Sequence, residues 1–233
     1  MFDWSLPRHC PSFLSSRQAR FAVPKFFAGD LLRRGPPPAA GGRGWAGQAW
    51  PSLFVAPTAG SRCALHTDAW GTAFWQLLMH GRKRWLVFAP DDAAHLFPDY
   101  HANSFAAADP LAGGTGTQRR RPPCPTECEV GPGDIIFVPA GAPHVVENVE
   151  PSVALAYNYV DGVNLDRALG ELRQTVGDDG GTGDHGSRRA GASTQTQSEM
   201  GGLAVARDLL LTLNAAASRL ANRNGSATSA AVE

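Results

Sequence analysis

Short hydrophobic runs bounded by proline and glycine dominate the middle of the chain, and such runs are typical of β-strands. The first is residues 50–55 (WPSLFV), and a turn at residues 58–61 leads into a second run that ends at His66. Four more β-rich runs, separated by the turns GPGD, PAGAP and EP, cover residues 128–130, 134–138, 145–149 and 152–160. This succession predicts a meander of short antiparallel strands, which closes best as a sandwich or a small barrel.

Between these runs, residues 72–80 (TAFWQLLMH) and 83–88 (KRWLVF) flank a tight turn that contains Gly81. A glycine turn between two hydrophobic segments predicts a β-hairpin. The hydrophobic positions of the first arm also fit a period of 3.6 residues, so a helix over that arm is the alternative.

The two ends of the chain have a different character. Residues 1–20 scatter aromatic side chains among prolines, which predicts an irregular segment that covers an edge of the core. The proline in residues 21–32 (FAVPKFFAGDLL) separates a strand-like start from a short helical turn. Leucines at helical spacing predict helices over residues 165–176 and 203–222. The last helix packs either on the barrel or on a second copy of the chain, so a homodimer through it is one expectation.

Composition completes the division of the chain. Residues 33–47 are dense in proline and glycine, which predicts a loop, and residues 177–202 are rich in glycine, serine, threonine and charged residues, which predicts a disordered linker. Residues 91–128 form a long insertion of little periodicity, which is typical of a lid or a disordered loop. The expected organisation is a cover segment and loop (1–49), a barrel (50–161), a helix (162–176), the linker (177–202) and a C-terminal helix and tail (203–233).

Charge and cysteine content narrow the classes of function. The 233 residues carry 21 basic and 21 acidic side chains, and this balance gives no global field that would attract nucleic acid or an anionic membrane. Four cysteines do not make a disulfide scaffold, and the first residues lack the basic start and hydrophobic run of a signal peptide. No hydrophobic stretch approaches the roughly 20 residues of a membrane-spanning helix. We therefore expect a soluble, intracellular protein, nuclear or cytoplasmic.

His66 and Asp68 are the strongest candidates for chemistry. Two residues apart on a strand or strand end, they leave the same face, so an imidazole and a carboxylate can point at one spot. His144, at the start of a later strand, is the natural third ligand, because two histidines and a carboxylate on one face leave the other positions of a ferrous ion open. An isolated pair of this kind is more often a surface hydrogen bond, but Lys83 on a neighbouring strand could bring an ammonium into the same cavity, which favours a metal site.

Residues 50–161 resemble the jumonji-C (JmjC) branch of the Fe(II)- and 2-oxoglutarate-dependent oxygenases, in the cupin superfamily. The His-x-Asp pair, GRKRW at residues 81–85 and the GDIIFVPAGAPHVVEN block occur in the order of that family. The resemblance is greatest to the branch with an arginine demethylase and lysyl hydroxylase, and residues 21–32 also look like its segment before the barrel. It implies a mainly β fold, a double-stranded β-helix (jelly-roll) barrel with helical appendages.

The resemblance also implies a set of site residues. His66, Asp68 and His144 would bind Fe(II), and Lys83 would form a salt bridge with the distal carboxylate of the co-substrate 2-oxoglutarate. In such enzymes O2 and 2-oxoglutarate react at the iron to yield succinate and CO2, and a nearby C–H bond is hydroxylated. Hydroxylation of an N-methyl group releases formaldehyde. The implied substrate is a protein side group, with RNA as a second candidate.

Four further positions relate to the co-substrate. Gln76 stands where relatives often have an amide that touches it, and Asn158 matches an asparagine near its metal-binding end. Ala156 departs from the pattern, because close relatives have a hydroxyl there that helps to hold the distal carboxylate. This departure implies weaker binding unless another hydroxyl, such as Thr72, compensates. Family members usually have further strands upstream, which is consistent with a fragment or a trimmed gene model.

Two other classes of function remain open. One is a metal-binding cupin with different chemistry, such as an isomerase or a sugar-binding protein, which would not need Lys83 to bind a dicarboxylate. The other is a degenerate oxygenase fold that serves as an interaction module, which the change at Ala156 favours.

Other candidates carry less weight. Cys124 and Cys128 have the spacing of half a zinc site, but no second half-site accompanies them, so an ordinary thiol pair is favoured. The arginines at residues 119–121 and 188–189 are expected in solvated loops. Three tryptophans could line a substrate cleft but are expected mostly in the core: Trp70, Trp75 and Trp85.

Overall fold

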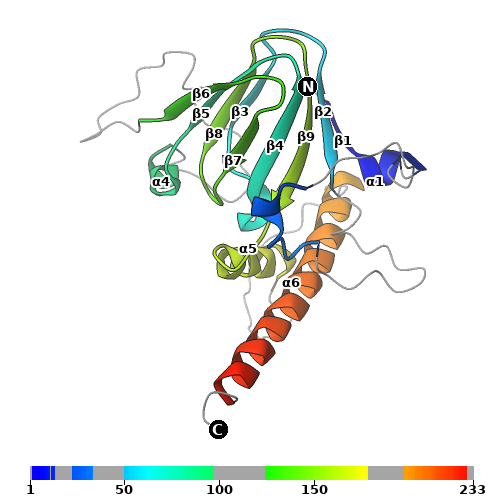
Figure 1. Ribbon diagram of the computed structural model, residues 1–233, viewed down its shortest axis with the longest axis vertical. Helices are drawn as coiled ribbons and strands as arrows, with labels where there is room; N and C mark the ends of the chain where they lie inside the picture. The colour runs from blue at the N-terminus through cyan, green and yellow to red at the C-terminus, as the bar shows by residue number, and fades with distance from the viewer. Residues whose placement is uncertain are drawn as a thin grey trace, which may run out of the picture.

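The computed structural model describes residues 2–10, 12–13, 23–33, 50–96, 124–177 and 197–229. Within these residues, two antiparallel sheets form a barrel, with two helices at one end of it (Figure 1). Sheet A has the order β1 (Phe2–Ser5), β2 (Ser52–Ala56), β9 (Ser152–Tyr159), β4 (Ala73–His80) and β7 (Ile135–Val138). Sheet B has the order β3 (Arg62–His66), β8 (His144–Asn148), β5 (Lys83–Val87) and β6 (Thr126–Val130).

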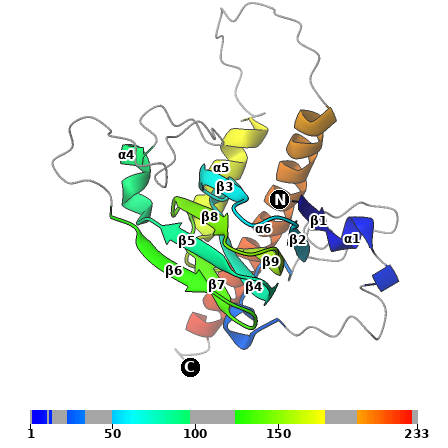
Figure 2. The same cartoon turned by 90° about the horizontal axis from the view of Figure 1, so that it is seen from above.

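Strands that follow each other from β3 onward lie mostly in opposite sheets. β4 pairs with β7 and β9, whereas β5 pairs with β6 and β8. The hairpin predicted over residues 72–88 and the meander predicted over residues 128–160 are therefore wrong, although strands occupy these runs. The jelly-roll architecture is confirmed. Figure 2, which looks down on the barrel, shows the two sheets as separate layers.

Gly81 explains why the predicted hairpin does not close. Its φ is +82°, and a Cβ placed there would lie 2.1 Å from the carbonyl oxygen of Pro151. Only glycine tolerates both this backbone conformation and this close approach. The turn therefore carries the chain past the β8–β9 connection and into the other sheet, and each strand buries one face against the opposite layer.

The N-terminal segment is more regular than predicted. β1 pairs with β2 and is followed by a short helix, α1 (Leu6–His9), so the prediction of an irregular segment is wrong for these residues. β1 does lie at an edge of sheet A. Pro24 precedes a 3-10 helix, η1 (Lys25–Phe27), which agrees with the helical turn predicted after this proline.

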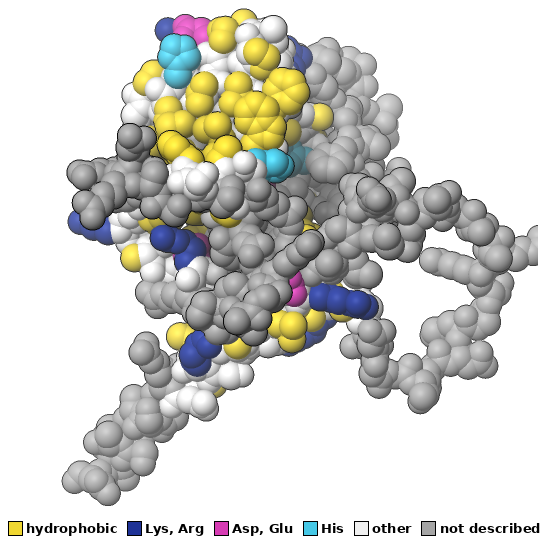
Figure 3. Space-filling view, turned by 90° about the vertical axis from the view of Figure 1, so that its right-hand side faces the viewer, with side chains coloured by type: hydrophobic (Ala, Val, Ile, Leu, Met, Phe, Trp, Pro, Cys, Tyr) yellow, Lys and Arg dark blue, Asp and Glu magenta, His cyan; other side chains and the backbone are white. Residues whose placement is uncertain are grey.

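Two hydrophobic layers flank sheet A. Its inner face packs against sheet B in a core that includes Phe74, Leu78 and Val138. Its outer face carries Trp75, whose ring stacks on Phe27 and Tyr157. Figure 3 shows hydrophobic side chains gathered on the side of the barrel where β1 and β2 lie in Figure 1.

The outer face of sheet B is charged instead. Arg62, Arg82 and Arg84 of this sheet and its turn form ion pairs with glutamates of the neighbouring strands and turns. Arg82 and Arg84 flank the inward-facing Lys83, as the period of two along a strand requires.

The helices α5 (Leu165–Val176) and α6 (Gln197–Ser229) pack on each other beneath the barrel (Figure 1). α6 begins before and ends after the predicted helix over residues 203–222. α5 also contacts η2 (Ala69–Gly71), and the two helices share a core that includes Leu172, Leu209 and Leu213. No helix among the described residues is long and hydrophobic enough to cross a membrane.

Part of the predicted insertion is also visible, as η3 (Pro90–Asp92) and α4 (Ala93–Leu96). The remainder, residues 97–123 with the arginines at 119–121, lies outside the described residues. The same holds for residues 34–49, and for residues 178–196 of the predicted linker, which include the arginines at 188–189.

Candidate metal and co-substrate site

A β-bulge in β3 brings two histidines to the same face of sheet B. Cys63 lies opposite Val146 of β8 and His66 lies opposite His144, so three steps along β3 match two along β8. In a regular strand Cys63 and His66 would point to opposite faces. The extra residue of the bulge restores a common direction, and both side chains line the interior.

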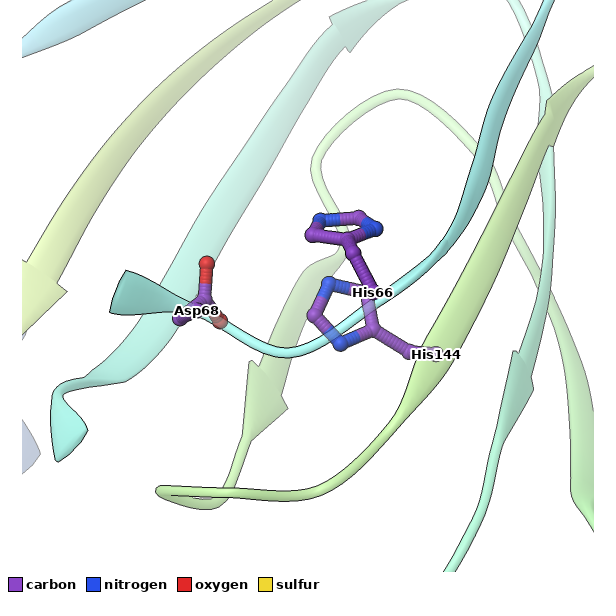
Figure 4. Close-up of side chains that lie close together, drawn as sticks. All are labelled: His66, Asp68 and His144. Atoms are coloured by element: carbon purple, nitrogen blue, oxygen red, sulfur yellow. The ribbon is translucent and has the colours of Figure 1, made fainter. Parts of the chain in front are cut away.

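Asp68 completes a cluster with these histidines. It lies just beyond β3 in extended conformation, before η2. The candidate ligand atoms of His66, Asp68 and His144 all lie within 4.8 Å of one another, and the two imidazole centroids are 4.1 Å apart (Figure 4). The three residues that the sequence singles out as metal ligands therefore converge in space.

Backbone carbonyls orient both imidazoles. With Nδ1 protonated, His66 donates to the carbonyl of Ala64 at 2.7 Å and His144 donates to that of Ala142 at 3.0 Å. This arrangement leaves Nε2 of each ring deprotonated, as a metal ligand must be, and it fixes the ring against rotation; Cys63 Sγ lies 3.9 Å from Nε2 of His66. The sequence does not identify these orienting groups, because they are backbone atoms.

Burial sets the protonation of the cluster. It lowers the pKa of His144 to about 4 and raises that of Asp68 to about 6, although His66 opposes the latter change. Burial, and then the proximity of His144, also lower the pKa of His66. Two neutral imidazoles beside a desolvated carboxyl, whose Oδ2 has no hydrogen-bond partner among the described residues, form a donor set that suits a divalent cation.

A pocket opens beside the cluster. Most of the exposed surface of its wall is hydrophobic, and polar groups from five residues converge in it. Its lining consists of Phe54, Cys63, His66, Asp68, Phe74, Gln76, Lys83, Trp85, His144 and Val146. Predominantly hydrophobic walls with a few placed polar groups are typical of sites for small molecules.

Lys83 is the cation of this pocket. Its side chain is 1% exposed, and burial lowers its pKa to about 8. No carboxylate of the described part of the chain lies within ion-pairing distance of it. Gln76, also buried, has an Oε1 without a partner among these residues. A buried ammonium is costly unless it is paired, so the pocket suits an anionic ligand.

Thr72 and Asn158, also predicted to contact the co-substrate, lie outside the pocket lining and bond to each other. Thr72 Oγ1 donates to the carbonyl of Ala69 at 2.8 Å and accepts from Asn158 Nδ2 at 2.7 Å. Neither residue belongs to the pocket lining. The structure thus brings His66, Asp68, His144, Lys83 and Gln76 together, while Thr72 and Asn158 bond to each other.

Five lining residues were not assigned to the site from the sequence: Phe54, Cys63, Phe74, Trp85 and Val146. Cys63 was not singled out, because its distance of three from His66 puts it on the wrong face unless β3 contains a bulge; its Sγ lies 3.7 Å from His66 Nδ1. Trp85 was expected mainly in the core, although its position two residues after Lys83 places it on the same face. Trp75 and Trp70 pack in the outer layer and against the helices. Cys124 and Cys128 are free thiols.

A jelly-roll barrel that carries two histidines and one carboxylate in a pocket between its sheets defines the class of mononuclear metal cupins. A model of the cupin-like domain matches residues 9–164, and the chain belongs to this family. The resemblance inferred from the sequence motifs is confirmed.

Similar proteins carry oxygenase names. The chain is 35% identical over 161 residues to the Caenorhabditis elegans bifunctional arginine demethylase and lysyl-hydroxylase psr-1, covering 62% of this chain and 36% of that protein. It is 28% identical over 184 residues to the human 2-oxoglutarate and iron-dependent oxygenase JMJD4, covering 75% and 39%. The Arabidopsis thaliana arginine-specific demethylase JMJ20 is 30% identical over 106 residues, covering 46% and 23%. The chain thus spans less than two fifths of the length of these relatives.

One solved structure, Drosophila melanogaster CENP-C bound to CAL1, aligns with a TM-score of 0.31 at 11% identity, covering 48% of this chain and 62% of the matched chain. This similarity is too weak to support a structural conclusion.

Proposed function

We propose that this chain is an Fe(II)- and 2-oxoglutarate-dependent oxygenase that hydroxylates or N-demethylates a protein side group. The observation that carries the proposal is the convergence of His66, Asp68 and His144 beside a pocket whose buried cation, Lys83, lacks a carboxylate partner among the described residues. The names of the relatives support it, since they refer to iron, 2-oxoglutarate, hydroxylation and demethylation.

Three of the pocket residues would bind the metal ion, and two others would bind the co-substrate. His66, Asp68 and His144 would hold Fe(II), and the ion would supply the activation of O2 for oxidation of a C–H bond. The ammonium of Lys83 would bind the distal carboxylate of 2-oxoglutarate, and Gln76 would orient the co-substrate from the opposite sheet. The walls of Phe54 and Phe74 would exclude water, which strengthens these electrostatic interactions.

A protein is the favoured substrate class. The names of psr-1 and JMJ20 refer to arginine and lysine, which are protein side chains. RNA remains the second candidate. The proposed homodimer through the C-terminal helix and the nuclear or cytoplasmic setting remain predictions; within the described residues α6 packs on α5 of its own chain.

The test is uncoupled turnover. We expect the Fe(II)-loaded chain to form succinate from 2-oxoglutarate and O2, and the His66→Ala, Asp68→Ala double variant to form none above the buffer background. Equal succinate from both proteins would refute the proposal.

Anaerobic titration separates the alternatives. A weak visible absorption band that appears when 2-oxoglutarate is added to the Fe(II)-loaded protein indicates chelation and supports the oxygenase. Metal binding without this band indicates a cupin with different chemistry. Absence of both indicates an interaction module.

A further inference from the structure

Ala156 occupies the position in sheet A where the family resemblance implies a hydroxyl that binds the distal carboxylate of 2-oxoglutarate. Ala156 lies between Ser52 of β2 and Gln76 of β4, each directly opposite it in the sheet. Residues directly opposite in adjacent strands share a face, so the Ala156 methyl lies next to Gln76 of the pocket lining. Ala156 offers no hydrogen-bond donor to a carboxylate held by Lys83.

The nearby hydroxyl groups are already engaged. The hydroxyl proton of Thr72 goes to the carbonyl of Ala69. Ser152 donates to Asn148 Oδ1 at 2.8 Å, and Ser52 forms a side-chain hydrogen bond with Asp3. None of these three hydroxyls lines the pocket, so the compensation by Thr72 that the sequence suggested has no support in the geometry.

The indole of Trp85 is an available donor. Trp85 is 2% exposed, lines the pocket, and its Nε1 has no hydrogen-bond partner among the described residues. An indole nitrogen can only donate, and a carboxylate can only accept, so the two are complementary. A buried donor without a partner costs about 1 to 3 kcal/mol, so an anionic acceptor in this pocket would stabilise the indole.

Trp85 lies on β5 between Lys83 and the metal cluster. Lys83 and Trp85 are two residues apart on β5 and leave the same face. Along β8, Lys83 lies opposite Asn148, Trp85 opposite Val146 and Val87 opposite His144. Trp85 is therefore midway between Lys83 and the metal cluster. Its ring stacks near His144, at 5.8 Å between centroids and 26° between planes, and this contact holds the indole in place.

We propose that the indole N–H of Trp85 donates a hydrogen bond to the carboxylate that Lys83 binds, and so replaces the hydroxyl missing at Ala156. This inference rests on the proposed function, because it assumes that 2-oxoglutarate is the ligand. Trp85 is thus a binding and selectivity residue: it favours 2-oxo acids that carry a second carboxylate.

The experiment compares two ligands on the zinc-loaded chain, because zinc is diamagnetic and does not support turnover. One ligand is 2-oxoglutarate, and the other is 2-oxopentanoate, which has a methyl group in place of the distal carboxylate. For Trp85→Phe, which keeps a ring but removes the donor, we expect affinity for 2-oxoglutarate to fall about tenfold or more, with affinity for 2-oxopentanoate unchanged. Phe54→Leu is the matched control, because it alters the same wall without a polar group and should affect both ligands equally.

A second measurement follows the donor directly in the unmutated protein. With 15N-labelled tryptophan, each of the six indoles gives one N–H resonance, and that of Trp85 is identified by its loss in Trp85→Phe. We expect 2-oxoglutarate, but not 2-oxopentanoate, to move this resonance downfield, as a new hydrogen bond to an anion requires.

The outcomes separate the two proposals. If 2-oxoglutarate binds but Trp85→Phe weakens both ligands equally and the resonance stays in place, Trp85 only packs against His144 and the inference is wrong, while the oxygenase proposal stands. If the unmutated zinc-loaded chain binds neither ligand, the oxygenase proposal fails and the inference fails with it.

Discussion

His66 and His144 lie directly opposite each other on β3 and β8, and their ring centroids are 4.1 Å apart. Burial lowers the pKa of both imidazoles, and the proximity of His144 lowers that of His66 further, so neither ring carries a positive charge at neutral pH. Their Nδ1 atoms donate to the carbonyls of Ala64 and Ala142, so in each ring Nε2 is the nitrogen that can bind a metal ion. The pair is prepared for a metal ion before the ion arrives, and Asp68 supplies the negative charge.

The metal-free site should weaken the fold as the pH rises from about 4 to about 6, because Asp68 must ionise there without a cation. Burial raises its pKa from 3.8 to about 6, so its contribution to stability is present below pH 3.8 and is lost as the pH rises through 6. Asp68→Asn removes this loss. We expect the metal-free variant to be more stable than the unmutated chain at pH 7.5, by about 1 to 3 kcal/mol, with about a third of this difference at pH 4.5.

Urea denaturation in the presence of a chelator at both pH values measures this difference. His144 provides an internal control. Because its pKa is lowered to about 4, its contribution to stability is present above pH 6.5 and is lost as the pH falls through about 4. This loss should be equal in the variant and in the unmutated chain. Addition of a divalent metal should make the unmutated chain the more stable of the two at pH 7.5, because only the unmutated chain keeps the Asp68 carboxylate as a ligand. A variant that is less stable at pH 7.5 without metal would show that the carboxylate is not strained by burial.

Lys83 should matter for the co-substrate and not for the metal. Lys83→Met removes the ammonium but keeps a long side chain, so we expect affinity for 2-oxoglutarate to fall about 100-fold or more, with metal affinity unchanged. The metal-free variant should be at least as stable as the unmutated chain, because a buried cation is gone. Arg84→Met on the outer face of the same strand is the control and should leave co-substrate affinity unchanged. Isothermal titration calorimetry measures both affinities; equal losses in the two variants would exclude a specific role of Lys83.

Ala156 offers a gain-of-affinity test. Ala156→Ser restores a hydroxyl next to Gln76, and one additional hydrogen bond to a carboxylate should tighten 2-oxoglutarate binding about threefold to tenfold. Ala154→Ser is the matched control, because it adds the same hydroxyl to the same strand opposite Leu78, in the hydrophobic core. The control should lose about 1 to 3 kcal/mol of stability without any gain in affinity. An unchanged affinity in Ala156→Ser would mean that position 156 does not reach the co-substrate.

Strand positions were predictable, but their partners were not. Alternating side chains and glycine or proline boundaries mark the strands of the barrel, whereas pairing depends on which layer each strand joins, and nothing local in KRWLVF excludes a hairpin with the strand before it. β1 escaped notice because it has only four residues and runs directly into the proline of α1. The packing of α6 on α5 needed the tertiary structure as well.

Some residues of the site could likewise be predicted from the sequence, and others could not. The metal cluster and Lys83 could be named from the sequence because their residue types and order resemble a family with that chemistry. Cys63 could not, because its direction depends on a bulge, and a bulge leaves no mark in RCALH. The bond between Thr72 and Asn158 was equally hidden, since a side-chain hydrogen bond over 86 residues is set by the pairing of β4 and β9.

Gly71 connects the helical layer to the metal cluster, three residues after Asp68. Its φ is +61°, and a Cβ there would lie 2.8 Å from Arg167 Cγ and 3.1 Å from the backbone nitrogen of Ala168 in α5. Trp70 before it also has a positive φ of 56° and packs on the core shared by α5 and α6. The turn that holds Asp68 is therefore fixed by close contact with the helices.

Gly71→Ala should reduce both stability and metal affinity. The positive φ alone costs an alanine about 1 to 2 kcal/mol, and relief of the clash with α5 must displace the turn that carries Asp68. We expect a larger loss of stability than this and a fall in metal affinity of about tenfold or more. Gly60→Ala is the matched control, since Gly60 has a similar φ of +76° but open space around it, and should lose only the backbone cost with normal metal binding. If the two variants behave alike in urea denaturation and zinc titration, the helices do not hold the Asp68 turn in place.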